Sequence, residues 1–471
     1  MPLDCPEVVL AGSPGDSGAS LIGQLSYEAL AADSSPLRTA LQLLGRLAPT
    51  SDTKGGPAQV ASPAGLVLPV DKVVVKPNWV MHRNRSEHGL ECLVTHAMVL
   101  AAVVDWVLAQ NPRSLVVGDA PVQGCDFEAL MLAAGYHRLR ERLRGSHPSV
   151  RWQDFRRAVL RQSGLLAAER EEVRPQQDYL LFDLGRDSLL EPISKDSDRF
   201  RVTMYNPDVM RETHRPGRHQ YLVAHDVIEA DVVINLPKLK THAKAGLTGA
   251  LKNLVGINGN KDYLPHHRAG GAGAGGDCYP GRSRLKQTAE SLADAWNRRT
   301  GWGAFTLRQA YRGACALARV ADGDDNMEGS WYGNDTVWRM CLDLNRILLY
   351  GRPDGTLADS PQRRLLHVTD AIVCGEGEGP LAPAPHPLGL LTVALNPVAA
   401  DFVHAHLMGL DWHKIPLIRE AFGQFRYPIA TFRPEDVVFH AAGSAKRQPW
   451  TAWPARPFRP PAGWRGHCEK T

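Results

Sequence analysis

The chain has 471 residues, 44% of them hydrophobic and 22% charged, enough to form a large core in one elaborated domain or in two to three domains. Its 54 basic and 50 acidic residues give a net charge of +4, too small to indicate nucleic acid or a membrane surface as a partner. No segment has the roughly 18 apolar residues of a membrane span, and the start lacks a secretory signal, so we expect a cytoplasmic protein. The eight cysteines form no Cys-x-x-Cys pair, which excludes the usual zinc and ferredoxin spacings.

Strands and helices are expected to alternate early in the chain. Residues 48–66 are small, polar and rich in Pro and Gly, which is typical of a surface loop. Two short β-branched runs follow, within 70–80 (VDKVVVKPNWV) and 115–121 (LVVGDAP), and an apolar helix is expected between them over 95–110. This strand–helix–strand order is typical of a βαβ unit in a parallel sheet.

The remaining pattern predicts an α/β fold: a mainly parallel sheet flanked by helices, with insertions and an irregular C-terminal tail. Further strands are expected within 221–237, 365–377 and 388–397, and helices at 284–298, 304–320 and 336–349. We divide the chain into an N-terminal extension and linker, an α/β region that could form two lobes, a helical insertion within it, and a Pro- and Trp-rich tail. These segments are, in the same order, residues 1–66, 67–445, 269–350 and 446–471.

Polar residues follow four of the predicted strands, in KPN (76–78), GDAP (118–121), NLPKLKTH (235–242) and GEGEGP (375–380). Ligands of open α/β sheets bind outside the carboxyl ends of the strands, so we expect the strands at 71–76, 115–118 and 231–235 to end at one cleft. The candidate binding residues there are Lys76, Asn78, Asp119 and Glu376, with Asp370 as a further acidic candidate. The alternative is that turn chemistry alone placed these residues after the strands.

A stretch rich in lysine and histidine spans residues 234–267, INLPKLKTHAKAGLTGALKNLVGINGNKDYLPHH. We predict a helix over about 245–255, with Thr248 and Lys252 four residues apart on one face. Its free N–H groups and positive dipole end would bind a carboxylate or phosphate. Lys238, Lys240, Thr248 and Asn253 join the candidate substrate-binding residues. The alternative is an ordinary solvated basic face of a helix.

Three histidines in this stretch are the candidates for chemistry. His242 lies between Lys240 and Lys244, whose charges should disfavour its imidazolium form, so it is a candidate general base. The alternative is that it caps or packs. His266 and His267 could hold a metal or donate to a substrate, and the glycine-rich segment 269–277 is expected to be a mobile cover for the cleft.

The chain resembles the domain of unknown function 362 family. The resemblance rests on VVVKPNWV, VVGDAP, ADVVINLPKLKTHAKAGLTGALKNLVGI, DAIVCGEGEGPLAP and NPVAADFVHAHLMGLD, which extend from about residue 70 to 425. Some relatives carry ferredoxin-type cysteine clusters; this chain has none, so the resemblance implies no iron–sulfur cluster here.

A shorter segment, HAKAGLTGALK, is similar to one in the lactate racemase family, which uses a nickel-pincer nucleotide. Both have the spacing His-x3-Gly-x-Ser/Thr-Gly-x2-Lys. The similarity implies that His242 is a catalytic base and that Lys252 holds a cofactor or phosphate. His266 and His267 lie in the neighbourhood of the nickel ligand, without a fixed register.

These features favour an enzyme that binds a small anionic substrate or a nucleotide-like cofactor and moves a proton or hydride at carbon, as a racemase or epimerase does. The cofactor would be a divalent metal or a nickel-pincer-like nucleotide. Two alternatives stay open: a non-catalytic anion-binding accessory protein, and a metal-assisted transferase or ligase in which the lysines clamp a phosphate and Asp119 or Glu376 holds the metal. No Walker motif and no dinucleotide-binding glycine fingerprint occurs.

Overall fold

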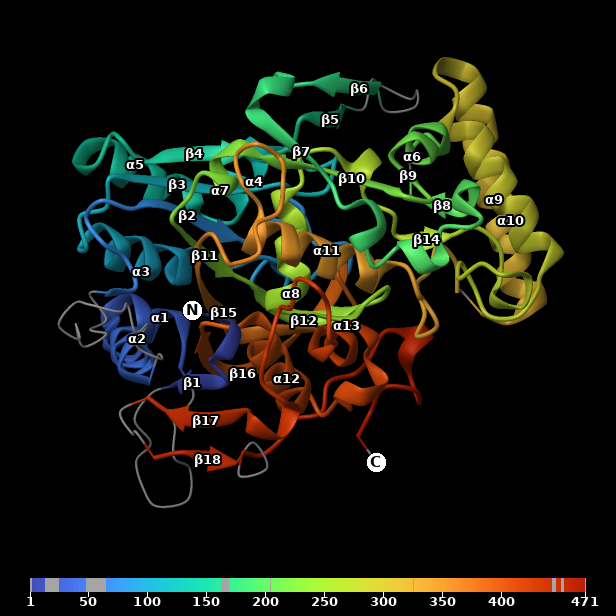
Figure 1. The fold of residues 1–471 in the computed structure, drawn as a ribbon. Helices are drawn as coiled ribbons and strands as arrows, with labels where there is room; N and C mark the ends of the chain where they lie inside the picture. The colour runs from blue at the N-terminus through green and yellow to red at the C-terminus, as the bar shows by residue number, and fades with distance from the viewer. Residues whose placement is uncertain are drawn as a thin grey trace.

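The computed structural model of the chain describes residues 2–12, 25–47, 65–161, 169–203, 205–324, 326–442, 446–449 and 453–470, so most of the predicted loop at 48–66 lies outside the described residues. An 11-stranded mixed sheet runs through the centre of the protein (Figure 1). One continuous row contains, in spatial order, β18 (Gln448–Pro449), β17 (Val438–Ala441), β1 (Glu7–Ala11), β16 (Ala382–Ala394), β15 (Arg364–Glu378), β11 (Val232–Leu236), β2 (Lys72–Pro77), β3 (Ser114–Asp119) and β4 (Arg151–Asp154). The last two strands, β12 (Lys238–His242) and β13 (Gly246–Thr248), branch from β15.

The parallel part of the sheet is the part that the βαβ pattern predicts. β15, β11, β2, β3 and β4 are parallel neighbours, whereas β15 and β16 form a long antiparallel hairpin that also pairs with β1. The predicted α/β class with a mainly parallel sheet is confirmed. Continuous β-branched runs such as Val73–Val75 suit these strands because both faces of the sheet are covered.

Helices cover the two faces of the sheet. Val73 and Val75 point into one core and Val74 into the other, as the alternation of a strand requires. The first core contains α1 (Tyr27–Ala32), α2 (Ser35–Leu47), α3 (Ala97–Leu108), α4 (Phe127–Ala133) and α5 (Tyr136–Ser146). The second contains α6 (Pro207–Thr213), α7 (His225–Ile228), α8 (Ala250–Asn253), α11 (Val337–Tyr350), α12 (Pro397–Leu407) and α13 (Pro416–Arg419).

A helical hairpin and three small sheets surround this framework. α9 (Arg284–Asn297) and α10 (Gly301–Asp322) pack against each other at one side of the protein (Figure 1). The small sheets are β7 (Tyr179–Asp183) with β10 (Arg218–Ala224) and β9 (His214–Arg215), β8 (Phe200–Arg201) with β14 (His267–Arg268), and β5 (Ala158–Arg161) with β6 (Glu169–Glu172). All three predicted helices, α9, α10 and α11, are present. However, α11 is almost wholly buried in the second core, so it is part of the framework and not of an insertion.

The N-terminal segment is not an extension, which corrects the expectation for residues 1–66. β1 lies inside the sheet, antiparallel to β16 and parallel to β17, and all five of its residues are buried. The sequence does not reveal this pairing, because the partner strands come more than 370 residues later. No helix in the described part of the chain has the length and apolar character needed to cross a membrane.

The glycine-rich segment 269–277 is anchored, which differs from the expected mobile cover. Its backbone bonds back onto the chain, from Ala272 N to Tyr279 O (2.9 Å) and from Cys278 N to Gly270 O (3.0 Å). Arg199 donates to the carbonyl of Ala274, and the carboxylate of Asp277 accepts from Thr336 Oγ1 at 2.6 Å. The small side chains allow this close folding of the backbone on itself.

The place of β1 in the sheet predicts the effect of truncating a valine. Val9 is completely buried, so Val9→Ala should lower the free energy of unfolding by about 2–3 kcal/mol through lost burial and a residual cavity. Val70 is 73% exposed, and the control Val70→Ala should change it by less than about 0.5 kcal/mol. Urea denaturation of both variants measures the difference. Equal effects would contradict a structural role for the first strand.

Candidate functional site

The carboxyl ends of the parallel neighbours β11, β2 and β3 lie at one edge of the sheet, and an ion pair joins two of them. Lys76 Nζ lies 2.7 Å from Asp119 Oδ1, and both side chains are buried. The carboxylate also accepts from Trp79 N (2.7 Å) and Ala120 N (2.9 Å). A side chain at Gly256 would collide with Asp119, so glycine is required where this loop passes the ion pair. Burial raises the pKa of Asp119 and lowers that of Lys76, and the contact between them opposes both shifts.

Four lysines, Lys240, Lys244, Lys252 and Lys261, lie beside this ion pair, and we call them, together with His242 and His266, the lysine cluster. Lys252 is at its centre: after burial, the positive charge of Lys252 is a further cause that lowers the pKa of Lys76, Lys240, Lys244 and Lys261. For Lys261 the pKa falls to about 7. Of these lysines, Lys76 alone is within hydrogen-bond distance of Asp119, and among the described residues no carboxylate pairs with the other four amino groups. The cluster therefore has an excess of cationic groups, and an anion would balance it.

The lysines differ in what they contact. Lys240 Nζ donates to Asn78 Oδ1 (2.7 Å) and to the carbonyl of Leu93, and Lys261 Nζ donates to the carbonyl of Ala120 at 3.1 Å. Lys244 donates to the carbonyl of Glu328. The side chain of Lys252 is half-buried and makes no hydrogen bond or ion pair with the described residues. Its amine is thus free to bind a ligand.

Two predicted binding residues, Asn78 and Asn253, bond to each other. Asn78 Nδ2 donates to Asn253 Oδ1 (2.8 Å), and Asn253 Nδ2 donates to Asn235 Oδ1 (2.7 Å). Asn235 in turn donates to the carbonyl of Ala250 at 2.9 Å. This chain of amides ties β2 and β11 to α8 and holds the segment that carries Lys252. We infer that it positions the lysine cluster.

The predicted helix over 245–255 begins later than expected. Residues 246–248 form β13, in which Thr248 faces Lys240 across the ladder, and α8 starts at Ala250. Asp401 of α12 accepts from the backbone N–H groups of Ala250 (2.6 Å) and Leu251 (2.9 Å). A protein carboxylate therefore occupies the position predicted for a ligand anion, and Gly249 is required because any side chain there would meet Asp401.

Asp401 is itself held by a buried chain of polar groups. His404 Nδ1 lies 2.9 Å from Asp401 Oδ1, and its Nε2 lies 2.7 Å from Thr392 Oγ1. The order resembles a hydrolase triad, but all three side chains are buried with no access for a substrate. Their role is to fix the start of α8. Thr248 stays a candidate contact, because its buried hydroxyl has no hydrogen-bond partner among the described residues.

The two histidines of the cluster are held in opposite tautomers. His242 Nδ1 accepts from the backbone N–H groups of Lys244 (3.1 Å) and Ala245 (3.3 Å), so the neutral ring carries its proton on Nε2. His266 Nδ1 lies 2.6 Å from the carbonyl of Leu264 and must donate to it, which leaves a lone pair on Nε2. Burial, followed by the charge of Lys252, lowers the pKa of both histidines well below the usual range. The expected direction for His242 is confirmed, but burial outweighs the charges of Lys240 and Lys244.

His267 lies in a different environment from His266. Its pKa is lowered by burial and then by Lys244, but Lys252 is not among the causes, and its Nδ1 has no partner among the described residues. Within the described ranges, no three His, Cys, Asp or Glu side chains converge to hold a metal ion. The two adjacent histidines thus have no further protein ligand beside them. Of the two, His266 is the one whose pKa, already lowered by burial, is lowered further by the charge of Lys252.

Two predicted binding residues have other partners. Lys238 is completely buried and pairs with Asp370 at 2.7 Å, and its Nζ also donates to Tyr27 Oη at 2.6 Å. Glu376 accepts from Arg459 N at 3.0 Å and lies 3.3 Å from His386 Nδ1, so it holds the C-terminal segment. Both side chains are therefore engaged by other parts of the protein. Sequence reasoning, in turn, did not assign Lys244, Lys261, Asn235 or Asp401, although the two lysines belong to the basic stretch.

The chain belongs to the domain of unknown function 362 family, whose model matches residues 73–163 and 187–406 and so confirms the resemblance. A thylakoid-associated protein of Synechocystis sp. is 24% identical over 397 residues, which cover 84% of this chain and 76% of the relative.

Two solved structures also match. A Thermotoga maritima protein has 12% identity and a TM-score of 0.32, with 77% of this chain and 54% of that one covered. The lactate racemase apoprotein from Thermoanaerobacterium thermosaccharolyticum has 10% identity and a TM-score of 0.29, with 72% and 50% covered. The chain thus spans about half the length of these two proteins. At such TM-scores neither match carries an argument about function.

Loss of the charge should destabilise the protein strongly at Lys238 and hardly at all at Lys252. Lys238→Met leaves the buried Asp370 without its cation and should lower the free energy of unfolding by about 3–5 kcal/mol. Lys252→Met removes a charge that makes no ion pair with the described residues, and should change the free energy of unfolding by less than about 0.5 kcal/mol. Urea denaturation measures both values, and the double variant Lys238→Met/Asp370→Leu should recover most of the loss. Unfolding of Lys252→Met would show that this lysine is structural.

Anion binding should weaken as the pH rises through about 7, the pKa of Lys261. Above that pH Lys261 is mostly neutral, and a bound anion favours its charged form, so binding must take up a proton. In the ligand-free protein the same lowered pKa makes the fold more stable as the pH rises from about 7, because the unfolded chain then holds more protons.

Calorimetry with sulfate, which does not titrate in this range, measures the affinity on both sides of pH 7. Two buffers of different ionisation enthalpy report the proton uptake. Lys261→Met should bind sulfate more weakly below pH 7 and abolish the uptake. An affinity independent of pH in the natural protein would remove Lys261 from the site.

Proposed function

We propose that the protein is an enzyme that binds a small carboxylate or phosphate at the lysine cluster and transfers a proton or hydride at the adjacent carbon, in the manner of a racemase or epimerase. One observation carries the proposal: the partnerless amine of Lys252 lies with two neutral histidines whose Nε2 atoms have opposite roles. A protein that only binds an anion would need the lysines but not the histidines. An acceptor and a donor beside them are what proton transfer needs.

The roles follow from the hydrogen bonds. The substrate anion pairs with Lys252, with Thr248 and Lys261 as further contacts, which leaves the next carbon near the imidazoles. His266 Nε2 accepts the proton from that carbon, and the electron pair moves into the neighbouring carbonyl or carboxylate. His242 Nε2–H donates to the oxygen where negative charge develops. A proton from water then adds to the opposite face of the carbon, which inverts it, and His266 releases its proton to water. The sequence predicts that His242 is the base; in this proposal His242 is instead a hydrogen-bond donor.

A nickel-pincer-like nucleotide, which the local similarity to lactate racemase implies, fits two of these residues. The amine of Lys252 could hold such a group covalently, and the Nε2 lone pair of His266 could ligate its metal. When bound, the group would supply hydride acceptance. The residues fit a metal only if the cofactor brings its own donor atoms, since no three metal-binding side chains converge in the described ranges.

The metal-assisted transferase finds less support. Its two proposed carboxylates are engaged, Asp119 by Lys76 and two backbone amides and Glu376 by Arg459 and His386. As an accessory binding protein, the chain would use the same lysines to bind the anion, but its histidines would transfer no proton. An exchange experiment therefore separates the two.

The natural protein should exchange the α-proton of at least one 2-hydroxy or 2-amino carboxylate for deuterium in D₂O, followed by proton NMR. His266→Gln deletes the acceptor and should slow the exchange by about 10²–10⁴-fold with binding retained. His242→Gln keeps an N–H donor and should retain more of the rate, whereas Lys252→Met should lose binding. Each variant is first compared with the natural protein by circular dichroism.

Inversion without deuterium uptake, detected by chiral chromatography, would select hydride transfer to a cofactor. If an acid binds but is neither exchanged nor inverted, the protein is a binder and the proposal is wrong.

A further inference from the structure

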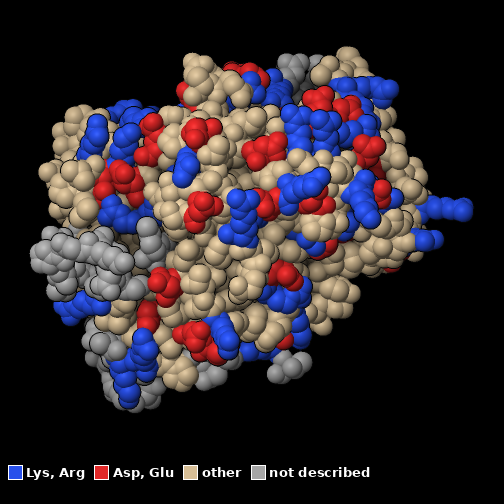
Figure 2. Space-filling model, in the orientation of Figure 1, with Lys and Arg blue, Asp and Glu red and all other residues tan. Residues whose placement is uncertain are grey.

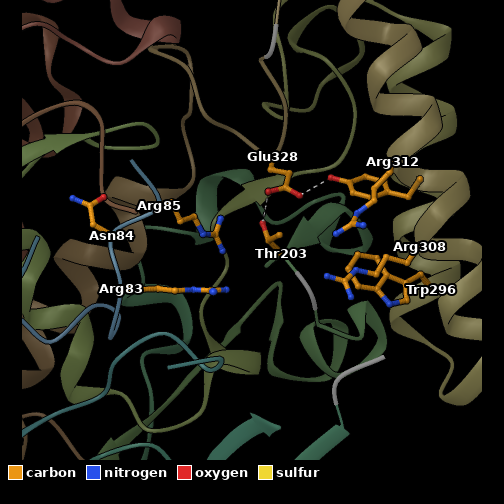
Figure 3. A pocket seen from close by; sticks show the side chains of 9 residues that line it. Arg83, Asn84, Arg85, Thr203, Trp296, Arg308, Arg312 and Glu328 are labelled. Atoms are coloured by element: carbon orange, nitrogen blue, oxygen red, sulfur yellow. Dashed lines mark hydrogen bonds between the residues drawn. The ribbon is translucent and has the colours of Figure 1, made fainter. Parts of the chain in front are cut away.

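A second cationic site lies beside the lysine cluster. A cleft of about 620 Å³ opens between the loop after β2 and the α9–α10 hairpin. Arg83 and Arg85 reach into it from the loop, and Arg308 and Arg312 from α10 (Figure 3). A cleft of this size holds a ligand of a few hundred daltons.

The four arginines have no acidic partner among the described residues. None of them makes an ion pair or a side-chain hydrogen bond with a residue in the described ranges. Other arginines next to the hairpin are paired, as Arg201 is with Asp294 (2.8 Å) and Arg298 with Asp208 (3.0 Å). Solvated arginines are common on surfaces, but here four from two separate elements face one cleft. On the face in Figure 2, by contrast, basic and acidic side chains are interspersed.

Glu328, the acidic side chain in the wall of this cleft, makes no ion pair with the four arginines. Glu328 accepts from Tyr311 Oη (2.8 Å) and Thr203 Oγ1 (3.0 Å), as the dashed lines in Figure 3 show. Arg308 and Arg312 are four residues apart on one helical face, where like charges oppose each other. Burial and then the charge of Arg312 lower the pKa of Arg308. A polyanion between the two walls would remove this repulsion.

The cleft also offers an aromatic surface. Trp296 is half-buried in its wall, with the guanidinium of Arg308 over the ring at 5.5 Å and Tyr311 at 5.9 Å between ring centroids. A planar base can stack on tryptophan or on a guanidinium plane, while guanidinium forks match phosphate oxygens in pairs of hydrogen bonds. An aromatic surface and four free guanidinium groups together favour a ligand with a planar ring and more than one phosphate.

We propose that this cleft binds a nucleoside diphosphate, with the base against Trp296 and the phosphates between Arg83, Arg85, Arg308 and Arg312. Guanidinium groups take the place of the phosphate-binding glycine motifs that the sequence lacks. The cleft adjoins the lysine cluster, because Lys244 donates to the carbonyl of Glu328 in its wall. The proposal does not depend on the chemistry at Lys252.

Calorimetry with ADP, inorganic pyrophosphate and adenosine at low ionic strength tests the site. ADP should bind, and Arg308→Gln and Arg312→Gln should each weaken both ADP and pyrophosphate by about tenfold to a hundredfold. Trp296→Leu should weaken ADP by about tenfold or more while leaving pyrophosphate unchanged. Arg312 is exposed, so its variant keeps the test valid even if Trp296→Leu or Arg308→Gln fails to fold.

A matched control separates the cleft from general charge. Arg284→Gln removes the same charge from α9 outside the cleft and should leave ADP binding unchanged. Absence of ADP binding at about 1 mM overturns the proposal. So does an equal loss in the Arg284→Gln and Arg312→Gln variants, or equal weakening of ADP and pyrophosphate by Trp296→Leu.

Discussion

The buried ion pair between Lys76 and Asp119 is the contact on which the site depends. It joins the ends of two adjacent parallel strands, and Asp119 also accepts from the backbone at Trp79 and Ala120. The loop after α8 passes so close that position 256 must be glycine. One contact thus fixes the ends of β2 and β3 and the loop that follows Lys252. Because a buried carboxylate without its cation is costly, these parts must assemble together.

Around this pair the fold concentrates positive charge that it does not neutralise. Lys238 shows how the protein treats a buried lysine that has only a structural role, since Asp370 and Tyr27 satisfy it completely. The lysine cluster is different: its amino groups contact carbonyl and amide oxygens, which satisfy hydrogen bonds but cancel no charge. Burial without neutralisation lowers lysine pKa values and raises the affinity for anions. The cleft lined by Arg83, Arg85, Arg308 and Arg312 likewise contains positive charges that form no ion pair with the described residues.

The backbone decides the chemistry of the histidines. His242 and His266 are equivalent in the sequence, yet two N–H groups make Nδ1 of the first an acceptor, and the carbonyl of Leu264 makes Nδ1 of the second a donor. Opposite tautomers at one site supply an acceptor and a donor at the same pH. Neither assignment could be made without knowing where the chain turns after each residue.

The sequence by itself determined the α/β class, the parallel strands at 72–77, 114–119 and 232–236, the three long helices and the basic loop where charge gathers, because these depend on local hydrophobic patterns. Only the tertiary structure decided the start of α8, the partners of Lys238 and Glu376, and the place of β1. Asp401 occupies the position expected for a ligand at the start of α8, although it lies 150 residues after Leu251 in the chain. β1 pairs with β16 and β17, which lie near the other end of the chain. Such contacts leave no periodic signal in the sequence, since their energy arises only when distant segments are buried together.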